Sequence, residues 1–366
     1  LLGGTEIGLY YANYHSRLPV LSGRTGTQVG FGNTQGVGNA AGATAQALGA
    51  GLSFDAAVAT GTAAGAAAAA ANGGDITNDE LSSWAAVGGN TYLTGGDVGD
   101  LITALATDQF GKTASFRTEF PEDIQIYGLS FATNVFGLSW QGEYTYKVDT
   151  PLQQDAVELL VAARSPISPG LGLNQNGPKG IDERVQGWRE KDVSQFQTTF
   201  TWFGDPMLGS DLPLIVGEAA FTKVHGFEDR QTGGPIGRGL RYDVPGTFVS
   251  GNRILASAHY NEVEEQSNFA NEFSWGYRLI ASLQYNNLIG PWTVTPRIGW
   301  SQDVSGNTPG PGGNFIEGRS SYSVGVKGDL QNKWQVDVAY TSFNGAGQQN
   351  LIRDRDFIAA TLSISF

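Results

Sequence analysis

The feature of this sequence that most constrains its fold is an alternation of apolar and polar residues, repeated in segments of roughly ten residues. Between residues 321 and 330, apolar side chains recur at every second position, and Lys327 and Asp329 lie among the polar residues between them. Successive side chains of a β-strand point to opposite faces, so such a segment has one apolar and one polar face. This pattern is typical of strands that place one face against lipid and the other against water.

The same alternation recurs along most of the chain. In residues 273–286, Ile280 is the one apolar exception on the polar face. By the alternation rule we count about ten or eleven strands, and a closed bacterial barrel normally has an even number. We expect strands in residues 7–11, 116–120, 127–135, 138–146, 196–202, 215–221, 273–286, 292–301, 321–330, 334–341 and 356–366. We therefore predict an all-β fold, an antiparallel transmembrane β-barrel of the outer-membrane type, spanning residues 1–366 as a single domain.

Short and long connections alternate between the expected strands. Gln331 and Asn332 predict a two-residue hairpin turn. Long polar or small-residue stretches occupy residues 18–112, 150–190, 225–271 and 305–319. Outer-membrane barrels have short periplasmic turns and longer extracellular loops, so the long stretches are expected at the extracellular end.

Aromatic residues lie near the ends of several apolar faces. Trp and Tyr favour the level of the lipid headgroups, so aromatic ends with aliphatic middles predict two membrane girdles. The predicted girdle residues are Trp275, Tyr277, Tyr285, Trp292, Trp300, Tyr322, Trp334 and Tyr340.

The last expected strand ends on Phe366, preceded at alternate positions by Ile364 and Leu362. Such an ending resembles the signal by which the barrel assembly machinery recognises its substrates. A buried edge strand of a soluble sandwich is the alternative, although soluble edges usually carry charges or proline.

Composition narrows the possible functions. The formal net charge is −13 with only 22 Lys and Arg residues, so nucleic acid is not an expected partner. The chain has no cysteine, which excludes disulfides and thiolate sites. The Ala-rich stretch 40–71 is too weakly apolar for a membrane helix and is interrupted by Asp55.

Residues 18–112 form the largest insert. It is Gly-rich to about Asn39, and we predict helix in residues 40–71 and near 98–108, because alanine has the highest helix propensity. The insert is expected to act as a loop, a cap or a plug of the lumen. If it is a plug, deletion of residues 36–71 should raise single-channel conductance.

Five segments carry a family resemblance: IGLYYANYHSRLP at 7–19, FPEDIQIYGLSF at 120–131, SWGYRL at 274–279, TPGPGGNFIEGR at 308–319 and DRDF at 354–357. They resemble a proteobacterial outer-membrane family catalogued as domain of unknown function thirteen-oh-two. The resemblance implies an outer-membrane barrel that handles hydrophobic compounds, with periplasmic components of a resistance-nodulation-division exporter as candidate partners. It also implies further N-terminal strands, so we expect the chain to be the larger C-terminal part of a barrel. It supplies no catalytic residue.

Charges of both signs are expected on the polar face. Buried charges need water or a partner, so these residues imply either a wet channel that orients polar or amphiphilic solutes or ion pairs that fill a narrow lumen. The residues expected to shape the path are Arg278, Arg297, Lys327, Asp329, Asp337, Glu143 and Glu218. Phe315 is also expected to shape the path. It is the one large apolar residue of the Pro- and Gly-rich segment 308–315, which predicts a latch or constriction of fixed conformation.

The leading functional hypothesis is a channel of the Gram-negative outer membrane that passes small hydrophobic or amphiphilic molecules passively. Its expected partners are outer-membrane lipid and the assembly machinery, and no enzyme activity, cofactor or metal is predicted. The alternatives are a partner-docking barrel without solute flux and a lipid-acting surface hydrolase, for which His15 beside Ser16 is the candidate site. Calcium binding stays open at four loop carboxylates, namely Asp75, Asp79, Asp97 and Asp100.

Overall fold

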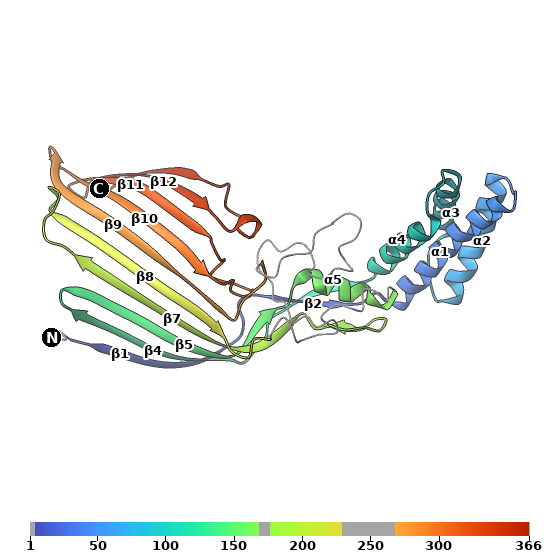
Figure 1. Ribbon diagram of the computed structural model, residues 1–366, viewed down its shortest axis with the longest axis horizontal. Coiled ribbons are helices and arrows are strands. Elements are labelled where there is room, and N and C mark those ends of the chain that lie inside the picture. Colours follow the sequence, from blue (N-terminus) through green and yellow to red (C-terminus); the bar gives the residue numbers. More distant parts are fainter. Residues whose placement is uncertain (1–3, 168–175, 229–267, 366) are drawn as a thin grey trace.

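A large antiparallel sheet and a helical projection lie at opposite ends of the molecule (Figure 1). The structure, a computed structural model, describes residues 4–167, 176–228 and 268–365. Strand β1 begins, and strand β13 ends, at the end of the sheet farthest from the helices (Figure 1). None of the described helices is both long enough and apolar enough to span a membrane.

Ten strands form the large sheet, and every neighbouring pair is antiparallel. They are β1 (Glu6–Tyr14), β4 (Ile124–Val135), β5 (Leu138–Gln153), β7 (Trp188–Phe203), β8 (Leu212–Val224), β9 (Phe273–Ile289), β10 (Trp292–Ser305), β11 (Ser320–Leu330), β12 (Trp334–Asn344) and β13 (Phe357–Ile364). Their spatial order follows the chain. Within the described residues β1 and β13 each pair on one side only, so the prediction of a predominantly β chain with a large antiparallel sheet is confirmed, while the sheet does not close on itself.

The pairing register gives this sheet two contrasting faces. On one face Leu9 pairs with Leu129, which pairs in turn with Tyr144. On the other face Ser130 pairs with Glu143, which pairs with a glutamine of β7. We call these the apolar face and the polar face. In the described part of the chain this apolar face is exposed, at Leu9 on the edge strand (81%) and also at Leu279 on β9 within the sheet (45%).

The connections agree with the predicted alternation of short and long links, with two corrections. The β11–β12 turn has three residues rather than two, because Leu330 still pairs with Trp334. Residues 116–120 do form a strand, β3 (Ser115–Glu119), but it pairs with β2 (Val20–Arg24) in a separate small sheet completed by β6 (Arg184–Val185). This segment therefore contributes nothing to the large sheet.

The helical projection consists of α1 (Gln28–Gly49), α2 (Phe54–Ala71), α3 (Asn78–Leu93) and α4 (Val98–Gly111). The sequence predicted α2, α4 and the second half of α1, but it was wrong about the Gly-rich first half of α1 and missed α3. Glycine is a poor helix former, yet here it permits close packing: an ideal Cβ on Gly88 of α3 would lie 2.6 Å from the Ala41 Cα of α1. Tertiary contact therefore overrides the local propensity.

A small junction joins the projection to the sheet. It contains the three-stranded sheet and helix α5 (Ala156–Arg164) (Figure 1). Helices α1–α4 lie beyond the end of the sheet that carries the long connections (Figure 1). Their shared core is built from small and aliphatic side chains, among them Val37, Ala40 and Leu81.

Candidate functional site

The polar face of the large sheet carries all seven charged residues that the sequence predicted along a path. Glu218 of β8 pairs with Arg278 of β9, and Lys327 of β11 pairs with Asp337 of β12. The remaining three, Glu143, Arg297 and Asp329, have the same orientation by strand alternation. The structure thus brings them to one surface, and their role in solute passage stays a prediction.

Arg297 and Asp337 form a bidentate ion pair across three strands. The Arg297 Nη1 and Nη2 atoms donate to the two Asp337 oxygens at 2.8 and 2.6 Å. The side chain passes over Gly325 of the intervening strand β11, where an ideal Cβ would lie 3.1 Å from the Arg297 Cζ. This bridge favours structural pairing for these two residues, because each neutralises the other.

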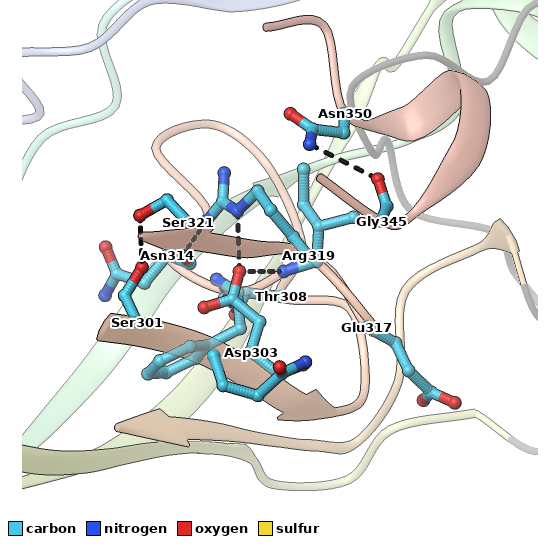
Figure 2. Close-up of polar contacts among 12 residues, drawn as sticks. Ser301, Asp303, Thr308, Asn314, Glu317, Arg319, Ser321, Gly345 and Asn350 are labelled. Atoms are coloured by element: carbon cyan, nitrogen blue, oxygen red, sulfur yellow. Dashed lines mark hydrogen bonds and ion pairs between the residues drawn. The ribbon is translucent and has the colours of Figure 1, made fainter. Parts of the chain in front are cut away.

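A recess of about 410 Å³ opens on the polar face across strands β9 to β12. Hydroxyl groups form part of its lining, and the Ser301 and Ser321 Oγ atoms lie 2.7 Å apart (Figure 2). Ile280 and Arg278 also line it. We call this site the hydroxyl recess. The apolar exception that Ile280 makes in the alternation is therefore the sequence signal that marks the recess.

The connection between β10 and β11, residues 306–319, folds into an ordered loop beside the recess, here called the latch loop. The Asp303 carboxylate accepts hydrogen bonds from Arg319 Nε at 2.7 Å and from the Ile316 backbone at 3.0 Å (Figure 2). Thr308 donates its backbone N–H to the Phe315 carbonyl at 2.9 Å, and its hydroxyl accepts the Phe315 N–H at 3.1 Å. These bonds fix one loop conformation, as the Pro- and Gly-rich sequence predicted.

Phe315 projects from the latch loop onto the polar face. Its ring packs beside Gly276 of β9, where an ideal Cβ would lie 3.1 Å from the Phe315 Cδ1 atom. Asn314 and Phe315 also line a recess of about 200 Å³ together with Glu143 and Gln195, which belong to β5 and β7. The loop therefore reaches over several strands and narrows the space in front of the polar face.

The chain matches the family model described as "Protein of unknown function (DUF1302)" over residues 1–366. It belongs to this family. No curated protein and no solved structure gives a match. The family description states no activity, so the function has to be argued from the two faces of the sheet.

The eight aromatic residues predicted as girdles all lie on the apolar face by register, as for Trp300 opposite Tyr322 and Trp292 opposite Leu330. Trp292 and Trp300 stand eight residues apart on β10, which is about 27 Å at ~3.4 Å per residue. Strands of an outer-membrane barrel tilt by about 35–45°, so this length spans roughly 20 Å along the membrane normal, slightly less than the usual apolar band of about 25 Å. Leu362 and Ile364 share the apolar face, whereas Phe366, the predicted end of the assembly signal, lies outside the described residues.

The hydrolase alternative receives little support from its candidate residues. His15 Nδ1 accepts the Asp123 N–H at 3.3 Å, and the Ser16 hydroxyl donates to the Leu18 carbonyl at 2.7 Å. Both residues are therefore engaged with backbone groups of the strand end, and neither is paired with the other.

A different serine and histidine do meet. Ser194 Oγ lies 2.7 Å from His225 Nε2 and 2.9 Å from the Tyr144 hydroxyl. No local pattern in the sequence indicates this pair, because it forms only when β7 lies beside the end of β8. Ser194 is 4% exposed, so its oxygen is shielded, and the three groups tie neighbouring strands together on the apolar face.

Two of the acidic residues considered for calcium are held by hydrogen bonds within the chain, and one of them, Asp97, caps a helix. Asp97 accepts the N–H groups of Gly99 and Asp100 at the start of α4, and Asp75 accepts a hydrogen bond from Asn33. Across the described part of the chain, no group of three or more His, Asp or Glu side chains is arranged to hold a metal ion.

Proposed function

We propose that this chain forms the wall of a barrel in the outer membrane of a Gram-negative bacterium and passes small hydrophobic or amphiphilic molecules passively. The observation that carries the proposal is the sheet with two contrasting faces, one exposed and apolar, the other polar and recessed. A barrel in lipid needs this combination, because its outside meets hydrocarbon and its inside meets water.

The apolar face supports a lipid environment. Large apolar side chains along it are exposed, including Leu279 at 45%, Val324 at 55% and Leu362 at 61%. Soluble monomers rarely expose continuous apolar surface of this extent, since each Å² left in water forgoes about 25 cal/mol. Outer-membrane lipid is the covering that matches this surface, and insertion there would require the barrel assembly machinery.

The polar face supports a wet path. Besides the hydroxyl recess, a recess of about 510 Å³ lies across β1, β4, β5 and β7. Its lining combines the carboxylates Glu6 and Glu143 with polar residues such as Gln197. The hydroxyl recess adds Ile280 beside Arg278, so the polar face as a whole suits solutes that carry both a polar and an apolar part. No energy source is needed for such passage.

The end with short turns is the expected periplasmic side. If periplasmic components of a resistance-nodulation-division exporter bind this chain, as the family resemblance implies, we propose that they dock there and not on α1–α4. The helices lie at the other end (Figure 1).

The test is solute flux in liposomes that contain the purified protein. Swelling with small amphiphilic solutes, together with heat-modifiable migration in detergent gels, would support the channel. Phe315→Ala should increase the flux, because the aromatic ring narrows the space in front of the polar face. A heat-modifiable protein that passes no solute, with or without Phe315, would replace the channel by the second candidate, a partner-docking barrel. The latch loop and the Arg297–Asp337 bridge, which fill part of the polar face, favour that candidate.

A further inference from the structure

We infer that the hydroxyl recess binds the carboxylate head of an amphiphile, with Arg278 as the anion-binding residue. This inference rests on the proposed function, because it identifies the class of solute that the polar face receives. It follows from the charge of the recess, its hydrogen-bonding groups and its apolar border.

Arg278 is a guanidinium group without a protein partner in the described part of the chain, where no hydrogen bond or ion pair joins its side chain to another residue. The other two arginines near this surface are neutralised, Arg297 by Asp337 and Arg319 by Asp303. A guanidinium group presents a planar fork of donors that matches a carboxylate in two parallel hydrogen bonds. Arg278 is therefore free to bind an anion.

Glu218 is the one acidic residue directly opposite Arg278 in the register. Its Oε2 atom accepts a hydrogen bond from Gln197 Nε2 at 3.0 Å. Gln197 belongs to β7, on the side of β8 away from β9, so the Glu218 carboxylate is held away from the recess. Glu218 is also not part of the recess lining. The positive charge of Arg278 therefore remains available.

Hydroxyl groups complete the polar part of the site. Ser301 and Ser321 share one hydrogen bond of 2.7 Å, so one of their two hydroxyl protons remains for an acceptor. Asp303, the acidic residue in the lining, already accepts from Arg319 and from the Ile316 backbone. The charged residues of the lining are Arg278, Arg319 and Asp303, so its formal charge is +1, which favours an anionic oxygen over a cation.

The border of the recess is apolar. Ile280, Phe343 and Ile352 line it beside the hydroxyl groups. The volume of about 410 Å³ falls within the range of roughly 300–1,000 Å³ that is typical of small-molecule sites. A ligand with a carboxylate at Arg278 and a hydrocarbon part against Ile280 would use both kinds of lining. A free sugar or an inorganic anion would use only one.

The experiment compares the binding of decanoate and decanol to the protein in lipid nanodiscs by titration calorimetry. The wild type should bind decanoate more tightly than decanol. Arg278→Gln should weaken decanoate binding by roughly tenfold or more, as is typical for loss of a charged hydrogen bond, and leave decanol unchanged. Arg278→Lys should restore part of the affinity, because an ammonium supplies the charge without the planar fork.

Lys333→Gln is the matched control, because it removes one exposed cation at the opposite end of the strands. It should leave both affinities unchanged. Decanoate affinity that is unaffected by Arg278→Gln, or an equal loss for decanol, would overturn the inference. If the protein passes solutes but Arg278→Gln still binds decanoate normally, the binding role of Arg278 is refuted and the channel proposal stands. If the preference for decanoate depends on Arg278 but the protein passes no solute, the binding site stands and the channel proposal is refuted.

Discussion

The ten-stranded sheet and the α1–α4 projection differ in where they place their apolar side chains. The sheet turns large aliphatic and aromatic side chains outward on its apolar face, where they are exposed. The projection has few such side chains and buries mainly alanine and glycine between its helices. The sheet therefore leaves its apolar side chains exposed, whereas the projection buries its own.

The two regions also differ in the charges that they carry. No Lys or Arg occurs between Arg24 and Lys112, a stretch that contains all four helices. The polar face of the sheet instead carries both signs, partly paired, as in the Arg297–Asp337 bridge. The projection thus has an acidic surface without cations, and the sheet has one apolar face and one face with charges of both signs. The predictions below test this difference.

The largest effect is expected for a charge placed on the apolar face. Val338→Arg in β12 should destabilise the sheet by roughly 2–4 kcal/mol if that face lies in hydrocarbon. Thr361→Arg is the control, because Thr361 of the neighbouring strand β13 faces the polar side opposite Asp337. It should cost less than about 1 kcal/mol. Urea unfolding in lipid vesicles measures both, and equal effects would mean that the two faces do not meet different phases.

The next effect concerns the projection. Gly61 of α2 is buried against α1, and a side chain there would overlap the Thr44 hydroxyl and the Ala40 carbonyl. Gly61→Leu should therefore destabilise the projection by about 3 kcal/mol through overpacking. Ala63→Leu, two residues away on the exposed side of the same helix, should have almost no effect. Circular dichroism would show loss of helix in the first variant only, with the strand signal unchanged in both.

The two regions also differ in how far the sequence could predict them. Alternation predicted the strands because period two is a local property of an extended chain with different phases on its two faces. The helices α1 and α3 were partly or wholly missed because their glycines are unfavourable locally and are justified only by contacts such as Gly88 with Ala41. The motif Thr77 to Glu80 did carry a signal for α3, since it forms a complete capping box.

For the candidate site, sequence reasoning placed the charges on the correct face but could not divide them by role. Arg278 and Arg297 look equivalent in sequence, each on the polar face of a strand. They are distinguished only by the structure, in which Arg297 extends over Gly325 of β11 and pairs with Asp337 of β12, whereas Arg278 has no such partner among the described residues. Such a contact depends on register between strands far apart in the chain, which no local pattern encodes.

A smaller effect is expected at the junction between the two regions. Glu119 of β3 accepts hydrogen bonds from Trp188 Nε1, from the Ser22 hydroxyl and from Arg184 Nη2. Burial raises the pKa of Glu119, but these hydrogen bonds and the Arg184 charge together hold the pKa below its ordinary value. A carboxyl group with a lowered pKa in the folded state stabilises the fold above its unfolded pKa of about 4.3, and this contribution is lost as pH falls through the folded pKa.

Amide hydrogen exchange in β2 and β3 measures this effect. Protection should fall between about pH 5 and the more acidic pH at which Glu119 titrates, by an amount equivalent to about 1 kcal/mol. Glu119→Gln should reduce protection at neutral pH and remove this pH dependence. A pH profile that is the same in wild type and variant would show that Glu119 does not stabilise the junction.

The smallest effect is expected for deletion of the helices α1–α4, which would strongly raise conductance if they formed a plug. The Thr27 N–H donates to Thr113 Oγ1 at 3.0 Å, so residues 28–112 can be replaced by two glycines without separating β2 from β3. Because α1–α4 lie beyond the end of the sheet, single-channel conductance should stay unchanged in this deletion (Figure 1). Phe315→Ala in the same background should raise conductance, since Phe315 packs onto the polar face beside Gly276. A rise caused by the deletion alone would restore the plug hypothesis, because it would place the helices in the path of the ions.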